Sequence, residues 1–160
     1  SEAYIRAFSA LYGIRSWILR LSNMVGERTT HGILFDFVKK VKKNKEELVV
    51  LGDGNQFKPY MYVGELIDCM FFVINNASER VNIFNVGPKD GVKVSVIAKI
   101  FLEHFGEGQK ITYTGGQTGW KGDVPFYSHN SEKLNRLGWE PKLSSEAAIR
   151  KAVTSIKETI

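Results

Sequence analysis

The sequence predicts a mixed α/β fold, in which a few strands of a larger parallel sheet carry a small α/β lobe. A helical pattern over residues 1–12 leads directly into an apolar strand pattern over 15–22, the order found in doubly wound sheets. A second strand of the same kind covers 81–86. The 160 residues are 43% apolar and 24% charged, which suits one domain with a hydrophobic core.

The N-terminal part is expected to form a helix, a strand, a loop and a second helix. The helix over 1–12 should stop at Gly13, because glycine readily adopts the left-handed conformation that ends helices. The strand over 15–22 should be largely buried. After a loop over 22–28, apolar residues at helical spacing predict a helix over 31–44, with Thr29 or Thr30 as its cap.

The central part is expected to contain two short strands and a helix. The first strand covers 48–51 and the second covers 57–63. The Gly52-x-Gly54 sequence between them is interpreted as a hairpin connection rather than a phosphate loop, because a polar turn and another strand follow it. A helix is then expected from Gly64 to about Asn75.

The C-terminal part alternates helices with one strand and one long loop. Ser95 is expected to cap a helix over 96–105, and a strand over 110–114 leads into a glycine-rich loop over 115–125. A short helix capped by Ser131 and a last helix beginning at Ser144 or Ser145 complete the pattern.

Composition excludes several classes of protein. There is no apolar run of 18 residues that would span a membrane, and the first residues lack the layout of a signal peptide. The single cysteine, Cys69, cannot form an internal disulfide and fits a buried thiol, so a reducing, cytoplasmic setting is expected. The three histidines are widely separated, so no metal site is predicted.

Positive charge is concentrated in the segment 39–45, which holds five lysines of a chain with a net charge of +5. Such a cluster suits either a nucleic-acid or membrane patch, or a solvated helix face that complements the negative end of the helix dipole. The second interpretation is favoured because Glu46 and Glu47 follow directly and no stacking aromatic residues are interleaved. Nucleic acid is therefore not an expected partner.

Catalytic motifs are absent from these 160 residues. There is neither a Gly-x-Ser-x-Gly nucleophile motif nor a Gly-x-Gly-x-x-Gly dinucleotide fingerprint, so no catalytic residue is assigned. Polar residues instead follow strands or lie in loops, where open α/β sheets bind ligands. His31 and Gly32 are expected at a helix start, where free backbone N–H groups can hold an anion or simply remain solvated.

Four segments in order resemble the C-terminal half of the NAD-dependent nucleotide-sugar epimerases and dehydratases, in the extended short-chain dehydrogenase/reductase family. SEAYIRAFSALYGIRSWILRLSNMVGER is similar to the family's stretch after its Tyr-x-x-x-Lys pair. LGDGNQFKPYMYVGELIDCM and FNVGPKDGVKVSVIAKIF resemble the two following motifs, and the segment beginning WKGDVPFYSHNSEKLNRLGWEP resembles the closing one. Each is weak alone, but their order and spacing make the resemblance specific, above all to UDP-glucose 4-epimerase.

The resemblance implies a substrate site for a nucleoside diphosphate sugar and a neighbouring site for NAD. It places the diphosphate at the helix start, the base on the first central strand and the sugar at an asparagine loop. Lys58 stands where the family has one arginine, Trp120 replaces a second, and Asp123 matches an aspartate near the ribose. The implied substrate residues are Asn23, His31, Gly32, Ile33, Val49, Leu51, Lys58, Trp120 and Asp123, and the implied cofactor residues are Ser22, Asn23 and Met24.

The resemblance also implies an organisation of one fragment-like domain over 1–160. Residues 1–28 and 64–90 would belong to the Rossmann sheet layer, and 29–63 and 91–160 mostly to the substrate-binding lobe. The family's NAD-binding half, with its glycines and its Tyr-x-x-x-Lys pair, is not in this sequence, so the chain alone is expected to be inactive. The helix over 1–12 implies a homodimer.

Three alternatives remain open at this point. The chain could be the equivalent lobe of a dTDP-glucose 4,6-dehydratase. It could also be a non-catalytic binding module that acts with a separate Rossmann subunit. A basic nucleic-acid-binding module that uses the lysines of 39–45 is the third.

Overall fold

The computed structural model describes residues 1–159 and confirms a mixed α/β fold with parallel strands. Parallel pairing is favoured here because helices connect the paired strands and pack on them. In chain order, the elements are α1 (Glu2–Tyr12), β1 (Ser16–Leu21), β2 (Asn23–Val25), α2 (Ile33–Lys43), β3 (Glu47–Val50), β4 (Phe57–Lys58), β5 (Tyr60–Tyr62), α3 (Val63–Asn76), β6 (Val81–Val86), β7 (Val92–Lys93), α4 (Val94–Phe105), β8 (Lys110–Tyr113), α5 (Glu132–Leu137) and α6 (Ser145–Thr159).

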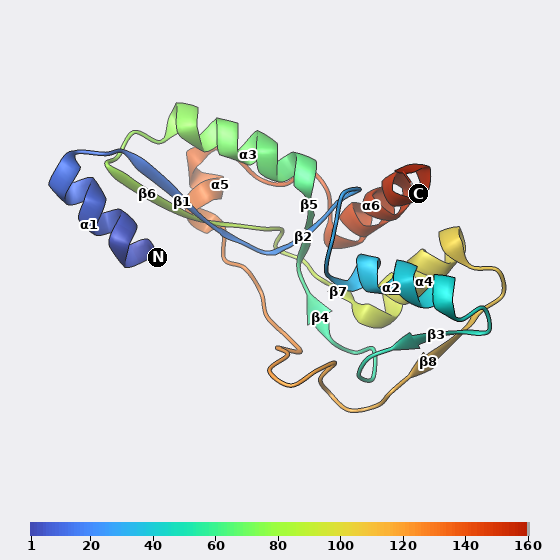
Figure 1. Cartoon of the computed structure of the whole chain (residues 1–160). Helices are drawn as coiled ribbons and strands as arrows, with labels where there is room; N and C mark the ends of the chain where they lie inside the picture. Colours follow the sequence, from blue (N-terminus) through green and yellow to red (C-terminus); the bar gives the residue numbers. More distant parts are fainter. Residues whose placement is uncertain (160) are drawn as a thin grey trace.

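Four strand pairs organise the described chain. β1 runs parallel to β6 with Ser16 opposite Val81 and Leu21 opposite Val86, so that the carboxyl ends of both strands lie side by side. β2 pairs in parallel with β5, and β3 pairs in parallel with β8. β4 pairs antiparallel with β7. Figure 1 shows that the short pairs β2–β5 and β4–β7 lie between the β1–β6 sheet and the β3–β8 sheet.

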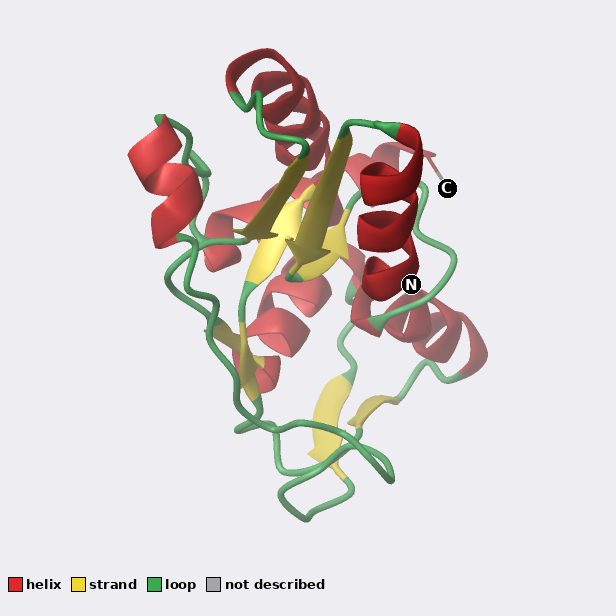
Figure 2. Ribbon diagram, turned by 90° about the vertical axis from the view of Figure 1, so that its left-hand side faces the viewer, coloured by secondary structure: helices red, strands yellow, loops and turns green. Residues whose placement is uncertain are grey.

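The described residues form two hydrophobic cores, which lie at the two ends of the molecule (Figure 1). We call α1, β1, α3, β6 and α5 the sheet layer, and α2, β3, α4, β8 and α6 the lobe. The core of the lobe includes Phe37, Leu48, Phe101 and Ile149, whereas that of the sheet layer is smaller and includes Cys69 and other residues of α3, β6 and α5. Figure 2 shows helices surrounding the strands of the sheet layer.

Two helix caps differ from the sequence prediction. The residue before α2 is Gly32, with φ 87 and ψ −179, and neither Thr29 nor Thr30 caps the helix. The hydroxyl of Thr29 instead donates to the carbonyl oxygen of His31 at 2.6 Å, and no side-chain hydrogen bond caps the helix. α4 begins at Val94, so Ser95 lies inside its first turn rather than at its cap.

The predicted hairpin at Gly52–Gly54 is wrong. β3 pairs with β8 and β4 pairs with β7, so the two strands that flank these glycines do not pair with each other. The predicted strand over 57–63 is divided at Pro59, because proline has no N–H to donate to a strand ladder. Both glycines have φ near 80°, which turns the chain from the lobe towards β4.

The strand β1 is less buried than predicted. Only Ile18 lies in the core, while Arg20 and Leu21 are exposed. The guanidinium of Arg20 forms a two-pronged ion pair with Glu2 of α1, at 2.8 and 2.7 Å. Short strands that the sequence did not indicate, β2 and β7, complete the junction between the two layers.

Candidate functional site

A cavity of about 960 Å³ lies at the junction of the sheet layer and the lobe. Its walls come from the carboxyl end of β1, from β2, from the start of α2, from the end of β3, from β4 and β5, and from the loop that holds Gly119 and Trp120. Segments far apart in the sequence therefore meet at the edge where parallel strands end, which is the usual ligand-binding edge of open α/β sheets.

The structure brings together eight of the nine predicted substrate residues. Val49 lies outside the lining, to which the end of β3 and the residue after it contribute Val50 and Leu51 instead. The predicted cofactor residues also line the cavity. The residues of both sets found there are Ser22, Asn23, Met24, His31, Gly32, Ile33, Leu51, Lys58, Trp120 and Asp123.

One end of the cavity is formed where β1 passes into β2. The backbone N–H of Ser22 donates to the carbonyl oxygen of Val86 at 3.0 Å, which fixes this turn to the end of β6. Ser22 is 6% exposed, and neither its Oγ nor Nδ2 of Asn23 has a hydrogen-bond partner among residues 1–159. Unpaired buried polar atoms are unfavourable, so this end is suited to a polar ligand.

The start of α2 forms a second wall. Gly32 provides no side-chain cap, so the N–H groups of the first helical turn are left without a side-chain acceptor. His31 and Gly32 are exposed, and the carboxylate of Asp36 in the first turn is paired with Lys40 at 2.6 Å. The partial positive charge of this helix end therefore faces the cavity without a capping oxygen.

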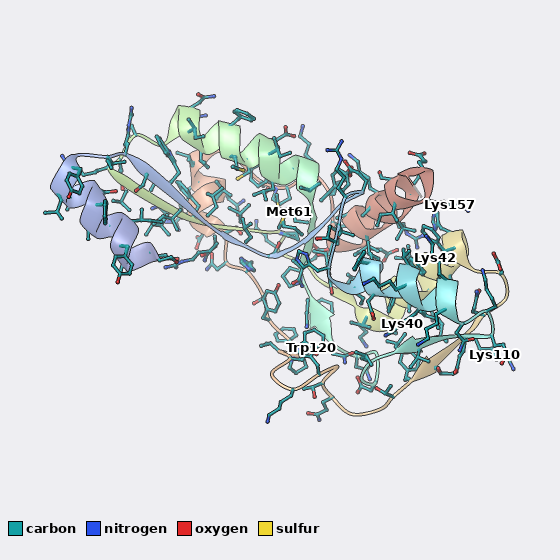
Figure 3. The ribbon with its side chains drawn as sticks, in the orientation of Figure 1. Lys40, Lys42, Met61, Lys110, Trp120 and Lys157 are labelled. Atoms are coloured by element: carbon teal, nitrogen blue, oxygen red, sulfur yellow. The ribbon has the colours of Figure 1, made fainter. Side chains whose placement is uncertain are left out.

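Lys58 is held in a buried ion pair. Its Nζ lies 2.5 Å from Oδ1 of Asp123, and the two side chains are 11% and 2% exposed. Oδ2 of Asp123 accepts the backbone N–H of Gly119 at 2.9 Å, so the aspartate also fixes the loop. Nζ lies 4.9 Å from the ring centre of Trp120, whose side chain Figure 3 shows on this loop beneath β4. The lysine, the aspartate and the indole thus form one unit.

Among the lining residues that the sequence reasoning missed are Glu27, Arg28 and Gln56. The carboxylate of Glu27 accepts the hydroxyl of Tyr62 at 3.0 Å. Hydrogen bonds from its own backbone N–H and from Tyr62 lower the pKa of Glu27. Glu27 and Arg28 end the first family-like segment, but the resemblance gave neither of them a role in binding.

Gln56 is fixed by its surroundings. Its Nε2 donates to the carbonyl oxygen of Leu51 at 3.2 Å, and its side chain is packed over Gly52, where a Cβ atom would lie only 1.8 Å from Nε2. The glycine pair Gly52 and Gly54 could have indicated this close packing, since glycine is required where another group approaches the backbone so closely.

None of the five lysines of the segment 39–45 lines the cavity, and only Lys40 is paired with a lining residue, Asp36. Lys39, Lys42, Lys43 and Lys45 are exposed, and Lys45 is paired with Glu107 at 3.1 Å. Figure 3 shows Lys42, Lys110 and Lys157 at the outer end of the lobe, far from Trp120. This arrangement fits a solvated helix face.

Two further features are absent from the described part of the chain, residues 1–159. No group of three or more His, Cys, Asp or Glu side chains is positioned to hold a metal ion. No helix is long and apolar enough to cross a membrane.

Sequence comparison shows which proteins this chain is similar to. It is 29% identical over 160 residues to a Methanocaldococcus jannaschii protein provisionally named UDP-glucose 4-epimerase, covering 98% of this chain and 50% of that protein. It is 24% identical over 158 residues to the dTDP-D-glucose 4,6-dehydratase of Mus musculus, covering 96% of this chain and 44% of the other. The chain thus spans about half the length of the curated relatives it matches.

Solved structures show the same likeness. A UDP-galactose 4-epimerase superposes with a TM-score of 0.85 at 28% identity, covering 99% of this chain and 51% of that one. The UDP-glucose 4-epimerase of Thermotoga maritima, solved with UDP-glucose, gives 0.82 at 27% identity with the same coverage. The sequence pattern of the NAD dependent epimerase/dehydratase family matches residues 1–87, more than half of the chain. The chain therefore belongs to the NAD-dependent epimerase/dehydratase family.

Proposed function

We propose that these 160 residues are the nucleotide-sugar-binding portion of an NAD-dependent sugar 4-epimerase that acts on a UDP-sugar. The observation that carries the proposal is the single cavity at the strand ends, which gathers eight of the nine residues implied by the family resemblance. A solved relative binds UDP-glucose in a fold that superposes on 99% of this chain. The equivalent lobe of a dTDP-sugar 4,6-dehydratase is the second candidate, because the mouse relative has that activity.

In this proposal the ligand lies along the cavity. The diphosphate lies between the start of α2, at His31, Gly32 and Ile33, and the wall that contains Lys58. The base lies against the end of β3 at Leu51; Val49, which the resemblance also implied, lies outside the cavity lining. Asp123 lies near the ribose, with Trp120 beside it, and Asn23 orients the sugar.

NAD would lie next to the sugar, against Ser22, Asn23 and Met24. Buried polar atoms of Ser22 and Asn23 that have no partner among the described residues fit a polar group at this place. When bound, NAD supplies the hydride acceptor for oxidation of the sugar at C4. The residues of this chain bind and orient the sugar nucleotide and exclude water from it.

Proton transfer is not assigned to this chain. Its sequence contains neither a Tyr-x-x-x-Lys pair nor a glycine-rich dinucleotide fingerprint. We therefore propose that the 160 residues bind substrate but do not turn it over without a Rossmann lobe. Mixing the chain with a Rossmann lobe from a relative, supplied with NAD and UDP-glucose, should restore epimerisation if this division of roles is right.

Calorimetric titration with UDP-glucose, dTDP-glucose and a short single-stranded RNA tests the function. The proposal expects micromolar binding of UDP-glucose, weaker binding of dTDP-glucose and none of RNA. Tighter binding of dTDP-glucose would favour the dehydratase. Absence of binding to both sugar nucleotides, together with salt-dependent RNA binding, would replace the proposal with the nucleic-acid module.

We also propose a homodimer through α1, in a cytoplasmic setting. Tyr4, Phe8 and Leu11 of this helix are 74%, 53% and 75% exposed, which is unusual for large apolar residues that recur on one helix. Light scattering behind a sizing column should give twice the mass of the chain. Phe8→Glu should halve it, and an unchanged monomeric mass in both proteins would contradict the proposal.

A further inference from the structure

The cavity wall contains more negative than positive groups, although the proposed ligand is an anion. Among the described residues that line it, the carboxylates are Glu27, Asp36 and Asp123, and the permanent cations are Arg28 and Lys58. A diphosphate is held more strongly when, besides the N–H groups at the start of α2, a side-chain cation without a carboxylate in contact faces it. Whether Arg28 or Lys58 is this cation depends on which of them is already paired with a carboxylate.

The pairing removes Lys58 as a source of net charge. Its ammonium and the carboxylate of Asp123 are in contact, and both are almost fully buried. Because the two opposite charges cancel, a phosphate near this corner meets a neutral pair. Separating the pair to free the lysine would leave a buried carboxylate next to the incoming anion, which is electrostatically unfavourable.

Arg28 is in the opposite situation. It is exposed, it lines the same cavity, and it forms no hydrogen bond or ion pair with another residue between 1 and 159. Its charge helps to lower the pKa of the neighbouring Glu27, whose carboxylate is held by the hydroxyl of Tyr62. The planar guanidinium presents a fork of N–H donors, which matches two phosphate oxygens at once.

The backbone on both sides of Arg28 is fixed. Gly26 is buried, and a Cβ atom there would lie 2.5 Å from a methyl group of Val63, so the chain enters this segment against α3. On the other side, the hydroxyl of Thr29 donates to the carbonyl oxygen of His31. The arginine therefore extends from a defined turn between β2 and the start of α2.

We infer that Arg28 supplies the net positive charge that meets the phosphates of the ligand, while Lys58 remains paired with Asp123. This rests on the proposed function, since it assigns the cation of the same site. Lys58 and Asp123 then form a fixed neutral corner that holds the Trp120 loop. The exposed guanidinium acts from the rim, beside the first turn of α2.

Titration with uridine, UMP and UDP isolates the contribution of each phosphate. The wild-type chain should bind UDP more tightly than UMP, and UMP more tightly than uridine. Arg28→Ala should lose about tenfold or more in UDP affinity and nothing in uridine affinity, because charge-assisted hydrogen bonds are lost. Arg28→Lys should recover part of the loss. The control Arg80→Ala, at the opposite end of β6, should match the wild type.

A double variant tests the buried pair without changing net charge. Lys58→Met/Asp123→Leu should keep the wild-type ratio of UDP to uridine affinity, although it can lower both affinities. The inference is overturned if the double variant loses this ratio and Arg28→Ala keeps it. In that case UDP binding by the wild type still supports the proposed function. A wild-type chain that binds none of the three ligands overturns both.

Discussion

The lobe and the sheet layer differ in how completely their apolar residues are covered. In the lobe, Phe37 and Phe101 are 2% and 0% exposed, and their rings meet at 5.5 Å in an edge-on arrangement. In the sheet layer, Phe8 of α1 and Phe71 of α3 are 53% and 65% exposed. Since buried apolar area is the main source of stability, the lobe should dominate the folding free energy of this chain. The sheet layer leaves more of its large apolar side chains exposed.

The strongest test of this contrast replaces one phenylalanine in each layer. Phe101→Ala should lower the free energy of unfolding by about 3–5 kcal/mol, the range for removing a buried phenylalanine ring. Phe71→Ala should change it by no more than about 0.5 kcal/mol, as for exposed positions. Urea unfolding followed by circular dichroism measures both. Similar losses in the two variants would mean that α3 is covered in solution, for example by a second copy.

The junction between the two layers can be tested at the buried ion pair. Lys58→Ala should cost about 3 kcal/mol of unfolding free energy, because it leaves the carboxylate of Asp123 buried without a counter-charge. The double variant Lys58→Met/Asp123→Leu should regain most of that loss, since no charge is then left alone. The urea midpoints of the three proteins provide the measurement. Equal losses in the single and double variants would show that packing, not charge, matters here.

A smaller difference is expected for two buried serines. The hydroxyl of Ser145 accepts the backbone N–H of Tyr60 at 3.1 Å in the lobe, and Ser9 is hydrogen-bonded to Ser16 at 3.0 Å in the sheet layer. Ser145→Ala should cost about 1–3 kcal/mol, because it leaves a buried N–H unpaired. Ser9→Ala should cost about 1 kcal/mol, because Ser16 is only half-buried and can be hydrated. Thermal unfolding of both variants provides the measurement. A larger loss for Ser9→Ala than for Ser145→Ala would contradict the expected order.

The smallest expected effect depends on pH. The pKa of Glu27 is lowered from 4.5, so its carboxylate contributes stability above that value and loses it as the pH falls through the lower, folded-state value. Glu27→Gln should therefore be slightly less stable than the wild type at pH 7, and this difference should shrink as the pH falls below 4.5 and through the folded-state pKa. Comparing urea midpoints at pH 7 and below pH 4.5 tests this. A constant difference between the proteins at both pH values would exclude the carboxylate charge as the cause.

Most helices could be predicted from the sequence, because apolar residues at helical spacing mark α2, α3, α4 and α6. The left-handed residue after α1, Gly13, was also predictable from residue type. Strand pairing was not. The strands β2 and β7 are three and two residues long and exist only because distant partners, β5 and β4, lie beside them. Such short segments carry no periodicity that a single sequence could reveal.

The candidate site was predictable in its members but not in its pairing. The family resemblance indicated Lys58 and Asp123 as separate ligand contacts. The structure joins them across 65 positions of sequence into one ion pair. A long-range contact of this kind depends on the path of the 115–125 loop. Its glycines at 115, 116 and 122 adopt positive φ, but the presence of glycines in a sequence does not indicate where the loop leads. Arg28 was overlooked because one exposed cation in a loop has no pattern.

The single cysteine has a practical consequence for labelling this chain. Cys69 is 0% exposed, and burial raises the pKa of its thiol to about 11, so it should resist alkylating reagents at neutral pH. A new cysteine placed on the surface would then be the one fast-reacting thiol. Fluorophores attached singly near the Trp120 loop, or as a pair there and on α2, can report loop movement during titration without first removing the native cysteine.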